Sequence, residues 1–249
     1  MPRCRAPSAF AIAGLLLVAP AVGALAGDEP VFASGARLCL ESVAIPTGEA
    51  DDPRRARLED ALVEYLEASS FAVRRPSEVA PRLEALVEAR PPYIDTATGE
   101  RLPEVWDAFL DGVAADLRDE LGCDFRVEAR IVQVAAPFRN GSARVDGRTM
   151  QVSSPGRVVR NVFAGVNEWG WVPALSLWVE VTDLRGELVA FRSAGVEPLV
   201  SLAVLVDQDL KPEDAWLSNP KDVGLALVLA LGLDAELLLE RGVPGGRRR

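Results

Sequence analysis

The order in which strand-like and helix-like segments alternate constrains the fold of this 249-residue chain more than any single motif does. Apolar residues recur at helical spacing in some segments and at every second position in others, and turn-forming residues separate the segments. We expect helices near residues 53–67, 77–87, 105–121 and 220–240, and strands near 38–45, 71–73, 125–131, 143–145, 149–152, 175–182 and 187–193. The predicted fold class is therefore α/β: a single mixed β-sheet, parallel in its first half and built from antiparallel hairpins in its second half, packed by helices.

Cap and turn residues indicate several boundaries. Asp51 or Asp52 is expected to cap the first helix and Ser77 the second, and Gly122 is expected to end the third. Asp146-Gly147 predicts a tight hairpin turn. The stretch 153–173 matches neither period, and no element is predicted there.

The N-terminus has the three-part pattern of a secretory signal peptide. A basic start precedes a short apolar run, and Ala24 and Ala26 occupy the two positions that a signal peptidase reads, which predicts cleavage before Gly27. The apolar run is shorter than a membrane-spanning helix requires. We therefore expect residues 1–26 to be a signal peptide, 27–241 a single α/β domain and 242–249 a disordered tail, in a periplasmic or secreted protein.

Export to an oxidising compartment would allow the cysteines to form a disulfide. Cys39 and Cys123 are the two cysteines of the mature chain, and an even pair in an oxidising compartment favours a disulfide. Closing such a long loop would stabilise the fold by about 4 kcal/mol in the chain-entropy model. The alternative is two separate buried thiols.

Composition excludes several classes of chemistry. The chain contains no histidine, which removes the commonest general base, the commonest metal ligand and every His-activated nucleophile. Its net charge of −10 disfavours binding to nucleic acid and to anionic membrane surfaces. No glycine-rich loop opens a helix, as phosphate binding would require. We expect no cofactor, no metal site and no nucleic-acid partner.

Ser218 and Lys221 form the one motif that could carry catalysis. Their spacing matches the S-x-x-K of serine acyl-enzymes, in which the lysine amine activates the serine. No accompanying S-D-N or K-T-G element is present. We favour the simpler interpretation, in which Ser218 or Asn219 caps the last helix and Pro220 occupies its first turn.

Other polar and aromatic groups favour structural roles. We interpret the acids at 207–214 as a solvated loop, because the glycine and the final glutamate of a calcium loop are missing. The acid pairs of the first and third helices are expected on solvated helix faces. The two indoles after position 168 are expected to pack in the core or under a loop, and the alternative is a sugar platform or a partner contact. These groups are Asp207, Asp209, Glu213 and Asp214; Glu64 with Glu67; Asp116 with Glu120; and Trp169 with Trp171.

Three segments together resemble a group of bacterial envelope proteins. The segments are LEDALVEYLEASSFAV at 58–73, LGCDFRVEARI at 121–131 and LSLWVEVTDLRGELV at 175–189. They are similar to units of the curli-secretion channel lipoprotein, the N-terminal domain of TolB and the lipoprotein activators of penicillin-binding proteins. The resemblance implies a protein that binds partners and assembles. It transfers no site residue, because the matching positions are core and turn positions.

The sequence thus favours a non-enzymatic, exported cell-envelope binding or assembly protein. Its expected partner is another envelope protein or a second copy of itself, with no stable membrane span after signal cleavage. The alternative is a secreted hydrolase that uses carboxylates or Ser218 and Lys221.

Overall fold

The computed structural model describes residues 35–46, 52–90, 93–95, 97–202 and 209–233. The expected signal cleavage site at Ala24, Ala26 and Gly27 and the expected tail at 242–249 lie outside the described residues. The elements follow one another as β1 (Arg37–Ala44), α1 (Pro53–Ala68), β2 (Ala72–Arg74), α2 (Pro76–Glu88), α3 (Pro103–Asp116), the π-helical turn η1 (Leu117–Leu121), β3 (Phe125–Arg139), β4 (Ser142–Val145), β5 (Arg148–Gln151), α4 (Pro155–Ala164), β6 (Trp169–Thr182), β7 (Leu188–Pro198), β8 (Val200–Ser201), β9 (Asp209–Leu210), the 3₁₀ turn η2 (Glu213–Ala215) and α5 (Pro220–Leu231).

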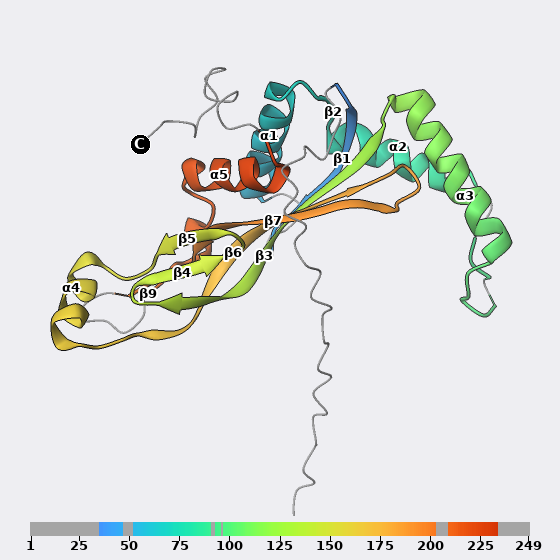
Figure 1. Ribbon diagram of the computed structural model, residues 1–249. Helices are drawn as coiled ribbons and strands as arrows, with labels where there is room; N and C mark the ends of the chain where they lie inside the picture. Colours follow the sequence, from blue (N-terminus) through green and yellow to red (C-terminus); the bar gives the residue numbers. More distant parts are fainter. Residues whose placement is uncertain (1–34, 47–51, 91–92, 96, 203–208, 234–249) are drawn as a thin grey trace, which may run out of the picture.

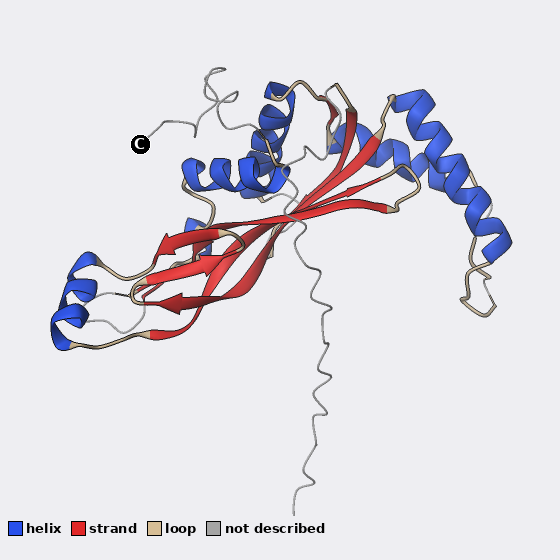
Figure 2. Cartoon of the chain, viewed as in Figure 1, coloured by secondary structure: helices blue, strands red, loops and turns tan. Residues whose placement is uncertain are grey.

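A mixed sheet of seven strands runs through the centre of the molecule (Figures 1 and 2). Strands β2, β1 and β3 pair in parallel, whereas β6 and β7 join β3 as an antiparallel meander and β4 and β5 form a hairpin at its far end. This arrangement confirms the predicted α/β class with a parallel first half and antiparallel second half. The small β8–β9 sheet was not predicted.

Strands β3 and β6 form a long ribbon that connects the two ends of the fold. They pair without a register shift from Arg126 opposite Thr182 to Arg139 opposite Trp169. We call the end that carries α3 proximal and the end that carries α4 distal (Figure 1). β1 pairs with the proximal half of β3, and β4 pairs with its distal end.

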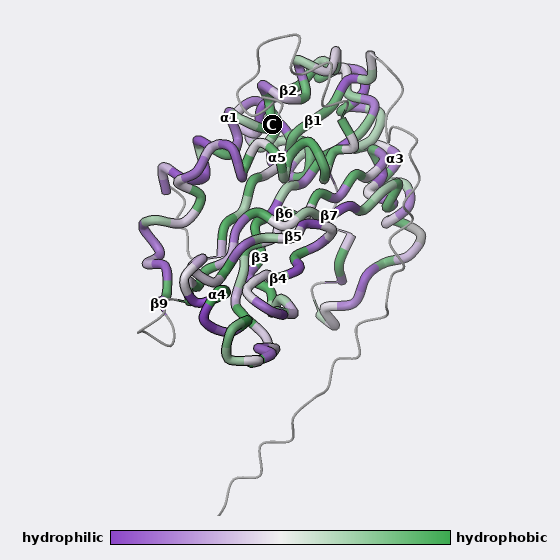
Figure 3. Tube along the Cα trace, turned by 60° about the vertical axis from the view of Figure 1, so that its left-hand side comes forward, coloured by the Kyte–Doolittle hydropathy of each residue, from purple (hydrophilic) through white to green (hydrophobic). Residues whose placement is uncertain are grey.

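The proximal half of the ribbon buries one face under α1 and α5. Its odd-numbered residues, such as Val127 and Leu177, join a core cluster with Leu62 of α1 and Leu227 of α5. Figure 3 shows α5 as a mostly hydrophobic segment next to the strands. That pattern explains why the sequence predicts a core helix.

The distal half buries the opposite face. Even-numbered residues, including Phe138 and Ala174, form a second cluster with the β4–β5 hairpin and with Leu202. Gly195 of β7 permits the close approach of that hairpin, because a Cβ added to Gly195 would lie 2.4 Å from the carbonyl oxygen of Val145. The cores of the two halves therefore lie on opposite sides of one ribbon.

A disulfide joins Cys39 of β1 to Cys123, which lies just before β3, with their Cα atoms 5.7 Å apart. Both cysteines are fully buried. They pack with residues of α2, α3 and η1, among them Val79, Phe109 and Leu117, in a third cluster. The disulfide thus lies under the two helices that cover the proximal end.

Caps and turns mostly follow the sequence. The Asp52 side chain accepts from the Arg54 amide at 2.8 Å and caps α1. Gly122 ends η1 in the left-handed region, and Asp146 and Gly147 both have positive φ in the β4–β5 turn. The Ser77 prediction is wrong: α2 begins one residue earlier at Pro76, whose fixed φ suits a first helical position, so that Ser77 lies inside the helix.

Candidate functional site

A helix occupies the stretch for which no element was predicted. α4 begins after Ser154, whose hydroxyl accepts from the Arg157 amide at 3.4 Å, and has Pro155 at its first position. It ends at Gly165, which has φ of 64°. Ser-Pro at the start and glycine at the end were the sequence signals that could have identified this helix.

α4 turns Arg157 and Asn161 inward and exposes most of its apolar residues. Asn161 is buried and Arg157 is nearly so, with 13% of its side chain exposed. The opposite side of the helix carries apolar residues that face solvent: Val159, Val162, Phe163 and, just after the helix, Val166. Phe163 is 89% exposed and Val162 is 73% exposed. A helix in a globular protein normally has the reverse arrangement.

The two indoles that follow α4 are also exposed, so the prediction that they pack in the core or under a loop is wrong. Trp169 is 81% exposed and Trp171 is 67% exposed. Both lie on the odd-numbered face of β6, which α1 and α5 cover only in the proximal half. In the distal half the core is on the other face, where Val172 is buried.

The exposed residues continue onto the neighbouring strand. Pro137 is paired with Trp171 and Arg139 with Trp169 across the β3–β6 ribbon, and both are exposed. We call α4, the loop 165–168, Trp169, Trp171 and these two β3 residues the distal surface. It combines exposed aromatic and aliphatic groups with arginine.

An ion pair anchors α4 to the distal end of the ribbon. Arg157 Nη2 lies 2.8 Å from Glu168 Oε1, and Arg157 Nε lies 3.0 Å from the same atom. Hydrogen bonding from Arg157 lowers the pKa of Glu168, an effect that the Asn161 side chain reinforces and partial desolvation opposes. The Glu168 carboxylate is therefore ionised at neutral pH, and it holds the polar face of α4 inward.

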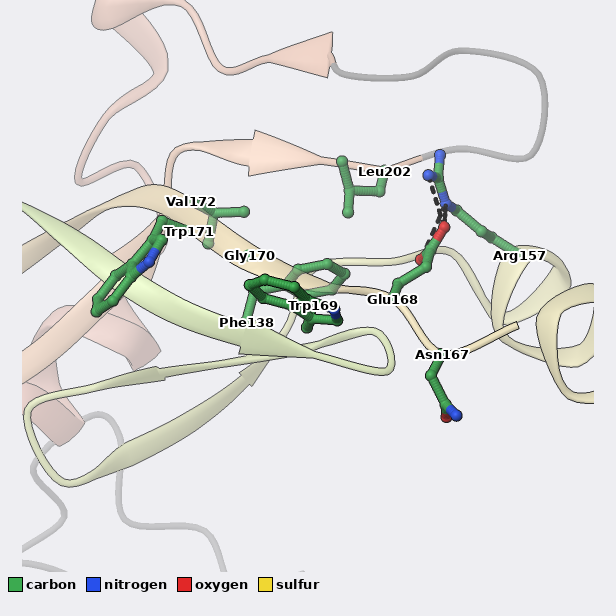
Figure 4. A pocket seen from close by; sticks show the side chains of 9 residues that line it. All are labelled: Phe138, Arg157, Asn167, Glu168, Trp169, Gly170, Trp171, Val172 and Leu202. Atoms are coloured by element: carbon green, nitrogen blue, oxygen red, sulfur yellow. Dashed lines mark hydrogen bonds and ion pairs between the residues drawn. The ribbon is translucent and has the colours of Figure 1, made fainter. Parts of the chain in front are cut away.

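A shallow hollow of about 760 Å³ lies beside this ion pair. Figure 4 shows Trp171 on one side of the hollow, the joined Arg157 and Glu168 side chains on the other, and Trp169 between them. Phe138 and Leu202 also contribute to its wall. The walls of the hollow combine apolar side chains, the two indoles and the neutral Arg157–Glu168 ion pair, a lining that can contact a partly apolar partner.

Ser218 and Lys221 do not share a cavity. Ser218 is exposed and lines a hollow of about 350 Å³ between α1 and α5, together with Tyr65 and Glu64, whereas Lys221 is not among its lining residues. Asn219 caps α5, because its side-chain oxygen accepts from the Lys221 amide at 3.1 Å. Of the two caps that the sequence allowed, Asn219 is therefore the cap and Ser218 is not.

The acidic candidates form no metal site in the part of the chain that the structure describes. Asp207 lies outside that part, and Asp209, Glu213 and Asp214 are exposed, as are Glu64 and Glu67. Glu120 is exposed, as expected, and pairs with Arg82 of α2, whereas Asp116 is half-buried and pairs with Arg90, which follows α2. Among the described residues, no helix is long and apolar enough to cross a membrane.

No family model matches this chain, and no curated protein matches it either. Three solved structures show weak likeness. The lipoprotein GNA1162 from Neisseria meningitidis is 11% identical with a TM-score of 0.29, and covers 65% of this chain and 82% of its own. The PelC dodecamer from Paraburkholderia phytofirmans is 11% identical with a TM-score of 0.34, covering 82% and 94%. The hypothetical protein CT253 from Chlamydia trachomatis is 13% identical with a TM-score of 0.35, covering 83% and 95%. Likeness at this level assigns neither a family nor a function.

Proposed function

We propose that this chain is a non-enzymatic, exported protein of the cell envelope that acts by binding, and that the distal surface is its binding surface. One observation carries the proposal: the apolar side of α4 faces solvent while its polar side is buried. Contiguous exposed apolar groups of this kind mark interaction sites. The signal-peptide pattern and the buried Cys39–Cys123 disulfide support export, because disulfides persist in oxidising compartments.

The hydrolase alternative has less support. A serine acyl-enzyme needs its lysine beside the hydroxyl, and Lys221 does not line the hollow that Ser218 lines. A fluorophosphonate or β-lactam probe should therefore leave Ser218 unlabelled. Labelling of the wild type that is lost in Ser218→Ala would favour the hydrolase.

Photo-crosslinking in intact cells tests the binding surface. A photoreactive amino acid placed at Phe163 should form a discrete adduct with an envelope component. The matched control is Leu188, which is 61% exposed but lies at the proximal end, and it should form none. Absence of any adduct from position 163, or the same adduct from position 188, would contradict the proposal.

A further inference from the structure

The distal surface differs from the rest of the chain in charge as well as in hydrophobicity. The distal surface carries three arginines, Arg139, Arg157 and Arg160, and one acid, Glu168, a local net charge of +2 in a chain of net charge −10. Glu168 is paired with Arg157, and the exposed Arg139 and Arg160 supply the remaining positive charge. The overall charge, which disfavours anionic surfaces, therefore does not describe this end of the molecule.

The distal surface has the combination of residues that is typical of helices lying at the interface between a membrane and water. Interfacial helices expose an apolar side with phenylalanine or valine and carry arginine beside it. Here Val159, Val162 and Phe163 supply the apolar side, and Arg160 lies on the same helix. Tryptophan is enriched at the boundary between lipid and water, where its ring is apolar and its N–H polar.

The sheet contributes a second strip with the same chemistry. Trp169 and Trp171 extend from β6 next to Arg139 and Pro137 of β3. A cross-strand arginine beside an indole can lay its aliphatic stem against lipid and keep its guanidinium at the headgroups. Figure 1 shows that α4 lies at one extreme of an elongated molecule, at the end of the ribbon away from α3.

We propose that the distal surface docks on the surface of an anionic phospholipid bilayer, with Phe163, Val162 and the two indoles inserted at headgroup level. This inference rests on the proposed binding function and names its partner. Charge complementarity selects lipid: a bilayer rich in phosphatidylglycerol presents negative headgroups above an apolar layer, matching a basic surface with an apolar centre. No spanning helix is required.

Vesicle binding by the full mature chain tests the inference. The wild type should co-sediment with vesicles of phosphatidylethanolamine and phosphatidylglycerol and far less with phosphatidylcholine alone, and raised salt should weaken the binding. Phe163→Asp should lower the partition coefficient by about tenfold or more, which is the factor that burial of one large apolar side chain supplies. Leu188→Asp, the same change at a residue that is 61% exposed at the proximal end, should leave binding unchanged. Both positions are exposed, so neither variant removes core packing.

The possible outcomes separate this inference from the proposed function. Equal binding to both vesicle types, or equal losses in Phe163→Asp and Leu188→Asp, would overturn the lipid inference. No vesicle binding together with a protein adduct from position 163 would overturn it and leave the binding function standing. No vesicle binding and no adduct would refute both.

Discussion

Replacing Gly195 with alanine should destabilise the fold by about 3 kcal/mol, because the added methyl group has no room. Its Cβ would lie 2.4 Å from the Val145 carbonyl oxygen, 2.6 Å from the Val145 Cβ and 2.8 Å from the Met150 Cε. The methionine end can move, but the carbonyl belongs to β4, which is paired with β5. Overpacking a tight core costs roughly 1–3 kcal/mol, and contact with a fixed backbone atom puts this site at the upper end.

Urea and thermal unfolding of the mature chain measure the effect. For a chain of this size each kcal/mol lowers Tm by about 2–4 °C, so Gly195→Ala should unfold about 6–12 °C below the wild type. Gly170→Ala is the matched control, since Gly170 also lies in a strand and a Cβ there meets nothing within 4 Å. If the two variants differ in stability by less than about 0.5 kcal/mol, the close approach of the hairpin to β7 is refuted.

Four further predictions concern caps, ion pairs and the disulfide. Arg148→Ala should cost about 2–3 kcal/mol in urea unfolding, because Arg148 donates to the Gly195 and Val196 carbonyl oxygens and to Asp222, whereas Arg144→Ala on the same hairpin is exposed and should cost little. Asn219→Ala should cost about 1 kcal/mol and Ser218→Ala less than half of that; the reverse order would restore Ser218 as the cap. Hydrogen bonding from Arg54 lowers the pKa of Asp52 to about 2, so the stability that this carboxylate adds is complete above its ordinary pKa and is lost as the pH falls from about 4 to 2; the advantage of the wild type over Asp52→Asn should shrink across that range, and a constant difference would contradict the assignment. Cys39→Ala with Cys123→Ala should lower stability by about 4 kcal/mol, and detection of two alkylatable thiols in the exported wild type would exclude the disulfide.

The sequence predicts an element well when the spacing of its apolar residues places all of them on the face that the fold buries. α1 keeps Leu58, Leu62 and Leu66 on one side, and all three are buried. The β6 alternation from Leu175 to Val181 likewise faces the α1–α5 core. For these segments the local pattern and the tertiary environment agree, so the pattern is sufficient.

The distal surface could not be predicted in the same way. α4 is amphipathic, but a rule that apolar residues face inward assigns Phe163 and Val162 to a core that the structure does not provide. The same rule predicts that Trp169 and Trp171 are buried. It fails because the local sequence does not show that α5 covers only the proximal half of β6. Which face is covered depends on how far a distant helix reaches along the ribbon.

The exchange of buried faces halfway along the β3–β6 ribbon has a consequence for strand alignment. Sliding one strand past the other by a single residue would move Leu177 out of the proximal core and Ala174 out of the distal one, so two independent cores reject the slipped pairing. Register is strongly specified wherever one face of a strand is buried, and here the two halves of the ribbon specify the same pairing from opposite faces. The position of α4 at the distal end therefore depends on packing in both cores. A mutation that weakens either core should allow more than one register of the ribbon, and with it more than one position of Phe163.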